Sequence, residues 1–213
     1  GLGDVYKRQV TDYGDNLIIP GFVDTHAHAP QYCNRGLGMD KELLPWLETY
    51  TFPEEAKFSD PDYARLVYGA FVQDLWRNGT TRSILFGTIH KESTLVLMEL
   101  LQKTGLSAYV GKVNMDRNSP DFLIEETNQS LVDTKEWLEE SIPFGPLVKP
   151  IITPRFVPSC TSELMSGLGK LAEEYNVPIQ SHLSENHGEI DWVASLHPES
   201  PNYTDVYYAH RLM

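Results

Sequence analysis

The stretch Leu17-Ile18-Ile19-Pro20-Gly21-Phe22-Val23-Asp24-Thr25-His26-Ala27-His28 guides the interpretation of the whole chain. Its apolar part predicts a buried strand over 17–23. Two imidazoles follow, at His26 and His28, and residues two apart on an extended backbone face the same way. That spacing suits two ligands of one metal ion, although two ordinary polar residues at a strand end would give the same pattern.

An apolar segment followed by an amphipathic helix recurs along the rest of the chain. The first helix is predicted to begin at the Asp60-Pro61 pair and to end at Asn78-Gly79. Strands that alternate with helices indicate parallel crossovers and an α/β fold, either a barrel or a doubly wound sheet. Further strands are predicted at 83–86, 108–113, 147–152 and 177–181, and further helices near 95–105, 124–138 and 164–175.

The composition narrows the possible functions. The 213 residues include 17 Lys and Arg against 30 Asp and Glu, a formal net charge of −13. Such an acidic chain repels phosphate backbones and anionic lipids, so we expect neither nucleic-acid nor membrane binding. With 41% hydrophobic and 11% aromatic residues, the chain has the composition of a globular protein with a large core.

The sequence also predicts the cellular compartment and the domain boundaries. The sequence has no apolar run long enough to span a membrane, and its start does not resemble a signal peptide, so we expect a cytoplasmic protein. Two cysteines, Cys33 and Cys160, form no disulfide framework and are expected to be reduced. Residues 1–16 show no periodicity and are interpreted as an irregular segment, whereas 17–213 are expected to form one domain.

A second group of chemically active side chains follows the predicted strand at 177–181. His182 could supply a further metal ligand, and Glu185, three residues later, could act as a proton shuttle. A single histidine at a strand end is more often simply a hydrogen-bonded polar residue. A barrel, however, would bring this strand end and the one near His26 around the same opening, which favours the functional interpretation.

A third group is suited to holding a flat heterocycle. Arg155, after the predicted strand at 147–152, offers a planar fork of donors, and Phe156 offers an aromatic face. A surface arginine beside a core phenylalanine is an equally good interpretation of that pair. Gln31 lies three residues past His28, and its amide can both donate to and accept from a purine or pyrimidine edge.

The remaining histidines give weaker signals. His90 follows a predicted strand and could line the opening. His187 and His197 are expected to be solvated, and His210 is expected at the surface because no strand precedes it.

Several of these stretches together resemble a known family. The segment Pro20–His28 is similar to the first-strand signature of the amidohydrolase superfamily, metal-dependent hydrolases on a (β/α)₈ TIM barrel. The finer resemblance is to the guanine deaminase branch of that superfamily, and it covers roughly residues 17–207. The stretches that carry it are His28–Tyr32, Leu43–Pro53, Asn78–Thr81, Val110–Asp116, Lys149–Phe156 and Gln180–Asn186.

The resemblance implies a reaction and a role for each candidate residue. It implies hydrolysis of guanine to xanthine and ammonia, a step of purine catabolism, in a cytosolic homodimer with one Zn²⁺ per complete site. The implied zinc ligands are His26, His28 and His182, and Glu185 is the implied proton-transferring residue. The implied substrate-binding residues are Gln31, Arg155, Phe156, His182 and Glu185.

The chain also departs from the family pattern. The family has a further histidine after its sixth strand and a zinc-binding aspartate after its eighth, and neither has a counterpart here; His210 does not match that histidine. We therefore expect a partial barrel of about five β/α units, with the family's small β-sandwich mostly missing and only part of the site present. On its own this chain is expected to bind zinc weakly and to lack measurable deamination.

Two other functions stay open at this point. One is another amidohydrolase that deaminates a different ring, of the triazine, cytosine or adenosine type. The other is a truncated, non-catalytic product that acts through dimerisation.

Overall fold

The structure of the chain is a computed structural model that describes residues 9–213. Half of the predicted irregular segment, residues 1–8, lies outside the described residues, and 9–21 contain no helix or strand. No helix within the described range has the length and apolar character needed to cross a membrane. The strands are β1 (Phe22–His28), β2 (Thr80–Phe86), β3 (Ser107–Gly111), β4 (Val113–Asn114), β5 (Val148–Pro150) and β6 (Thr153–Pro154).

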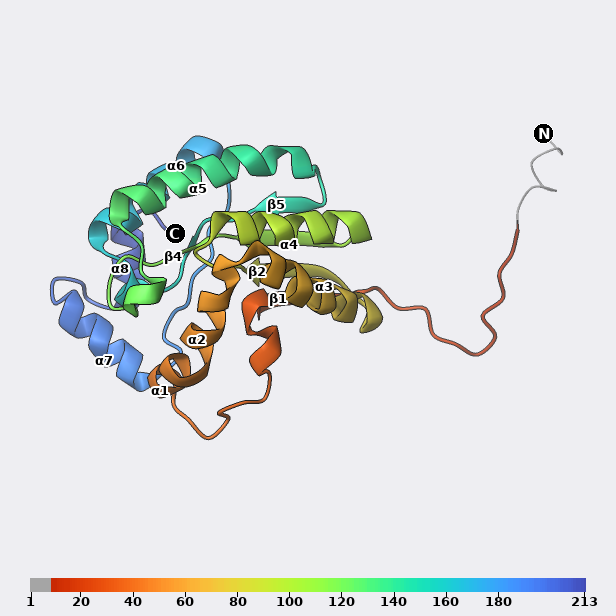
Figure 1. Ribbon diagram of the computed structural model, residues 1–213, viewed down its shortest axis with the longest axis horizontal. Helices are drawn as coiled ribbons and strands as arrows, with labels where there is room; N and C mark the ends of the chain where they lie inside the picture. The colour runs from red at the N-terminus through yellow and green to blue at the C-terminus, as the bar shows by residue number, and fades with distance from the viewer. Residues whose placement is uncertain (1–8) are drawn as a thin grey trace.

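The strands form an arc, and within each sheet they lie side by side in the same order as in the sequence. Four strands pair in parallel in the order β1-β2-β3-β5, β4 pairs in parallel with β6, and a single parallel bridge joins Ile152 to Ile179. A doubly wound sheet would reverse its strand order and carry helices on both faces. Here consecutive helices cover one side (Figure 1), so the arc is part of a barrel and confirms the predicted α/β fold.

The helices lie between the strands, as the sequence periodicity predicts. Asp60 caps the first long helix through its side chain, Pro61 is its first residue, and the helix ends before Asn78. The next long helix ends at Gly105, whose φ of 72° places it in the left-handed region that favours glycine. The α-helices are α1 (Leu43–Trp46), α2 (Phe52–Glu55), α3 (Pro61–Arg77), α4 (Lys91–Thr104), α5 (Thr127–Ser141), α6 (Ser162–Tyr175), α7 (His187–Leu196) and α8 (Tyr203–Ala209).

Short helical turns connect these elements. One of them, η2 (Ala29–Asn34), follows β1 directly and carries Gln31. The others are η3 (Leu47–Thr51), η4 (Ala56–Ser59), η5 (Asp121–Leu123), η6 (Ile142–Phe144) and η7 (Val157–Ser159).

Three predicted strands are wrong in their details. Leu17 and Ile18 are 91% and 81% exposed, and β1 begins only at Phe22, after Pro20, which has no N–H to donate to a sheet. His26 and His28 therefore lie within β1 and not after it. The predicted strand at 177–181 shrinks to the bridge at Ile179, beside Pro178, and the one at 147–152 is replaced by β5 and β6.

The core lies between the sheet and its helices and continues up to the strand ends. The main cluster packs β2 and β3 against α3, α4, α5 and α6, with fully buried side chains such as Leu85, Val110 and Trp137. A second cluster, which includes Phe86, Phe156 and Leu47, lies at the carboxyl ends of the strands. That apolar cluster forms the floor of the site described next.

Candidate active site

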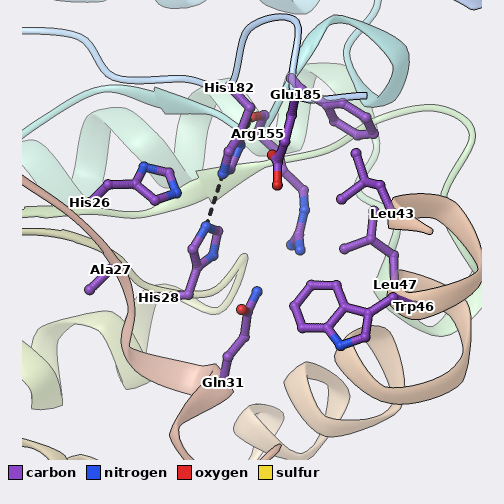
Figure 2. Close-up of a pocket in the computed structure, with 11 residues that line it drawn as sticks. His26, Ala27, His28, Gln31, Leu43, Trp46, Leu47, Arg155, His182 and Glu185 are labelled. Atoms are coloured by element: carbon purple, nitrogen blue, oxygen red, sulfur yellow. Dashed lines mark hydrogen bonds between the residues drawn. The ribbon is translucent and has the colours of Figure 1, made fainter. Parts of the chain in front are cut away.

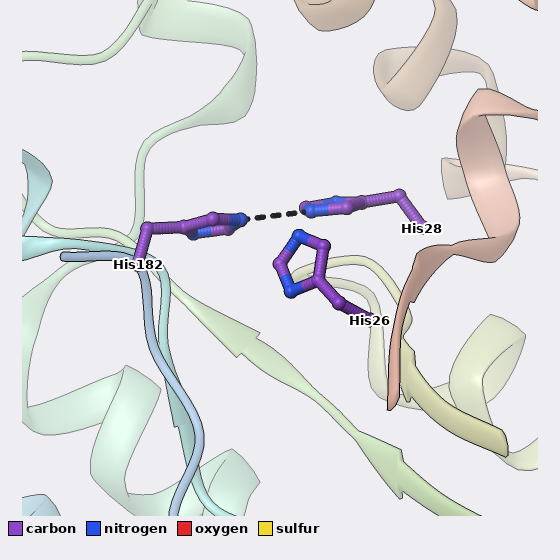
Figure 3. A group of neighbouring side chains, drawn as sticks. All are labelled: His26, His28 and His182. Atoms are coloured by element: carbon purple, nitrogen blue, oxygen red, sulfur yellow. Dashed lines mark hydrogen bonds between the residues drawn. The ribbon is translucent and has the colours of Figure 1, made fainter. Parts of the chain in front are cut away.

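Three imidazoles converge at the carboxyl end of the sheet. His26 and His28 project from β1, and His182 lies on the segment that follows the Ile179 bridge. One nitrogen of each ring lies within 4.8 Å of one nitrogen of the other two, and Nε2 of His28 is 2.9 Å from Nε2 of His182 (Figure 3). The structure thus brings together residues that are more than 150 positions apart, since His28 and His182 are separated by 154 residues in the chain.

The surrounding backbone fixes the orientation of His182. Its Nδ1 is 2.6 Å from the main-chain carbonyl oxygen of Arg155, and its own carbonyl accepts a hydrogen bond of 2.6 Å from the hydroxyl of Tyr207. A carbonyl oxygen only accepts, so the ring proton lies on Nδ1. In the neutral ring, Nε2 is then left with a lone pair that points toward His28.

Burial keeps two of the three rings neutral. It lowers the pKa of His28 well below its ordinary value, and charge repulsion from His182 and Arg155 lowers that pKa further. Burial also lowers the pKa of His182 to about 4. The face of His28 stacks on Phe86, with ring centres 4.4 Å apart. Neutral imidazoles that share one small volume are the donor set of a catalytic transition-metal site, so these residues fit a divalent metal ion.

A cavity of about 280 Å³ opens beside the imidazoles (Figure 2). One part of its wall consists of the three imidazoles and other polar side chains, and the opposite part is apolar and comes largely from α1. The indole N–H of Trp46 donates a hydrogen bond of 2.9 Å to the carbonyl of Leu37, which fixes this ring at the edge of the cavity. The lining residues are His26, Ala27, His28, Gln31, Leu43, Trp46, Leu47, Arg155, Phe156, His182 and Glu185.

Arg155 and Phe156 both lie at this cavity, directly after β6. Arg155 is 2% exposed, and it makes a two-pronged ion pair with Glu55, with N–O distances of 2.5 and 3.2 Å. Gln31 also reaches this carboxylate, because its Nε2 donates to Oε1 of Glu55 at 3.4 Å. The alternative interpretation of Arg155 as a surface residue is wrong, because its guanidinium is buried against the cavity.

Sequence reasoning missed Glu55. The signal was weak: it is the second of two adjacent glutamates, Glu54 and Glu55, between the apolar residues Phe52 and Phe58. Both carboxylates are buried, which two consecutive acidic residues seldom are unless they are paired.

Glu185 lies at the rim of the cavity, on the loop between His182 and α7. Its side chain is exposed, whereas its backbone N–H donates to the buried carboxylate of Glu189 at 2.8 Å. Ser184, immediately before it, has a φ of 57°, a left-handed conformation that a serine adopts only when its surroundings impose it. The loop therefore holds Glu185 at a defined place beside the imidazoles.

The other histidines lie elsewhere. His90 directly precedes α4, where its side chain makes no capping hydrogen bond, and it is not among the residues that line this cavity. His187 is exposed, as predicted. The prediction that His197 is solvated is wrong: it is 4% exposed and accepts a hydrogen bond of 3.0 Å from Arg117. His210 is half-buried, with Nδ1 2.8 Å from the hydroxyl of Ser166.

A parallel arc of strands with a cluster of imidazoles at its carboxyl end has the architecture of the α/β-barrel class. The sequence profile of the Amidohydrolase family matches residues 17–212, and the chain belongs to that family.

Known proteins refine this placement. The chain is 52% identical to a guanine deaminase of Dictyostelium discoideum over 97% of its length and 46% of that protein. It also matches a crystal structure of guanine deaminase from C. acetobutylicum with bound guanine in the active site, with a TM-score of 0.96, 56% identity, and coverage of 98% of this chain and 50% of that one.

A more distant structure shares the fold alone. It is an adenosine deaminase from Xanthomonas campestris with bound zinc, at a TM-score of 0.77 and 20% identity, covering 91% of this chain and 42% of that one. The chain spans about half the length of the relatives it matches.

Proposed function

We propose that the protein containing this chain hydrolyses guanine to xanthine and ammonia, with a zinc ion held by His26, His28 and His182. The observation that carries the proposal is the shared cavity, in which three imidazoles meet Arg155, Gln31 and Phe156. The guanine deaminase relatives support the choice of substrate. The preference for zinc follows from an all-imidazole donor set with no thiolate or carbonyl oxygen.

Some side chains of the cavity bind the substrate, and another transfers a proton. Arg155 donates to a carbonyl of the purine, Gln31 contacts a neighbouring polar edge, and Phe156 packs against the ring. A zinc ion held by these imidazoles would supply the Lewis-acid chemistry that activates water for hydrolysis at the carbon bearing the amino group. Glu185 transfers a proton to the adjacent ring nitrogen and assists the departure of ammonia. Water supplies the new oxygen, so no other reactant is needed.

Assays of the full-length gene product test this proposal. Purified protein is incubated with guanine and with a panel of ring amines of the triazine, cytosine and adenosine types, and the products are separated by chromatography. The proposal predicts xanthine from guanine as the fastest reaction. Faster turnover of another ring amine would assign the site to a different amidohydrolase activity. The homodimer and the cytosolic location stay predictions, and gel filtration with light scattering tests the first of these.

A further inference from the structure

The carboxylate of Glu55 lies behind the polar wall of the cavity, in contact with two residues that line it. Glu55 is the last residue of α2 and is 1% exposed. Its two oxygens accept hydrogen bonds from Nη1 and Nη2 of Arg155 at 2.5 and 3.2 Å, and Oε1 also accepts from Nε2 of Gln31 at 3.4 Å. One buried carboxylate thus contacts both polar side chains that the proposed function assigns to the purine.

We infer that Glu55 is a positioning residue that sets the donor and acceptor pattern of the purine pocket through Arg155 and Gln31. The inference rests on the proposed function and deepens it, because it states how the pocket selects its substrate class. Glu55 itself is absent from the residues that line the cavity, so it acts through its two partners.

The first step of the argument concerns the direction of Arg155. A buried guanidinium and a buried carboxylate are each costly alone, and a two-pronged pair compensates both charges while fixing the plane of the fork. The ring of Phe52 packs against the same guanidinium, 5.2 Å from its central carbon. Arg155 points into the space beside His28 and Trp46 (Figure 2), and its remaining N–H groups are donors already directed before a ligand binds.

The second step concerns the amide of Gln31. Because its nitrogen donates to Glu55, its oxygen is left to accept from a ligand. The pocket then presents a donor from Arg155 and an acceptor from Gln31. That pair suits a ring edge with a carbonyl next to an N–H or amino group, as in a lactam purine. In adenine the two roles are exchanged, because the exocyclic amino group donates and the neighbouring ring nitrogen accepts, so a donor and an acceptor held at fixed positions distinguish the two rings.

The direct test compares two neighbouring glutamates in the full-length gene product. Glu55→Gln keeps the shape of the side chain and removes its charge. Glu54→Gln is the matched control, because Glu54 is buried one residue away but bonds to Lys57 and Tyr63. We expect Glu55→Gln to raise KM for guanine about 10- to 100-fold, the range of one or two charged hydrogen bonds, with kcat changed much less. Zinc content should follow that of the control, whereas Tm should fall further than in the control because the buried guanidinium of Arg155 loses its counter-charge. An unchanged KM in a folded, zinc-loaded variant would overturn the inference.

A double variant shows whether Glu55 acts through Arg155. Glu55→Gln combined with Arg155→Gln removes both charges, so no uncompensated ion stays buried. We expect Glu55→Gln to raise KM for guanine much less in the Arg155→Gln background than in the wild type, since only the longer contact to Gln31 is then left for Glu55 to act through. Fully additive effects would refute this route. A wild-type protein that makes no xanthine would remove the proposed function as well, whereas an active wild type with an unaffected Glu55→Gln variant removes only this inference.

Discussion

The imidazole of His182 is hydrogen-bonded through Nδ1 to the main-chain carbonyl of Arg155, at 2.6 Å. The two residues come from segments that join only at the carboxyl end of the sheet. The backbone of Arg155 sets the proton position on an imidazole of the proposed metal site, and its side chain is held by Glu55 on the side of the cavity proposed to bind the purine. The proposed metal site and the proposed purine pocket therefore share one structural element, the segment that follows β6.

His182 should be required for metal binding. His182→Ala in the full-length gene product removes one of three imidazole donors, and we expect at least a 100-fold loss of zinc affinity, beyond the range of about 10–100-fold known for residues that only support a ligand. His187→Ala is the control, because His187 is exposed. Zinc content after dialysis, measured by elemental mass spectrometry, checks both. Equal zinc in the two variants would exclude His182 as a ligand.

Glu185 should affect turnover without affecting metal content. Replacing it with Gln keeps the size of the side chain and removes its ability to transfer a proton. We expect kcat for guanine to fall about 10²- to 10⁴-fold, the usual contribution of a general acid or base. The exposed Glu163 on α6 supplies the control, Glu163→Gln. A Glu185→Gln variant with normal kcat would assign proton transfer to another group.

Two glycines should respond in opposite ways to alanine. At Gly111 an added Cβ would lie 1.8 Å from Oγ1 of Thr153, so Gly111→Ala forces β3 and β6 apart and should destabilise the protein by about 2 kcal/mol. At Gly69, inside α3, an added Cβ meets nothing within 4 Å, so Gly69→Ala should stabilise by about 0.5–1 kcal/mol. Urea unfolding of both variants measures these changes, and a Gly111→Ala variant as stable as the wild type would contradict the close approach of Gly111 to Thr153.

The two cysteines should differ sharply in reactivity. Cys160 is completely buried, and burial raises the pKa of its thiol to about 12, which suppresses the reactive thiolate. Cys33 is exposed. Iodoacetamide at pH 8 should therefore label Cys33 and leave Cys160 unmodified in the native protein, as peptide mass spectrometry can show. Labelling of both at similar rates would mean that the core around Cys160 opens readily.

Local signals in the sequence predict much of the fold. Asp60, Pro61 and Gly105 mark helix ends because capping and left-handed backbone depend on the residue itself. The convergence of His26, His28 and His182 was predictable once a barrel was assumed, since strand ends meet at one opening.

Features that depend on distant contacts could not be predicted in this way. Glu55 and Arg155 are 100 residues apart, and no sequence pattern near either residue indicates that they form an ion pair. The exposure of Leu17 and the burial of His197 also depend on which segments pack against them, and periodicity carries no information about those neighbours.

The central claim is that the imidazole cluster holds a zinc ion that serves guanine deamination. The most direct measurement follows xanthine formation by the full-length gene product before and after removal of metal with a chelator, and again after addition of one equivalent of zinc, with metal content determined at each stage. We predict about one zinc per chain, loss of xanthine formation together with the metal, and recovery of both on addition. Xanthine formation that persists in protein freed of metal, or zinc-loaded protein that makes no xanthine from guanine, would contradict the account.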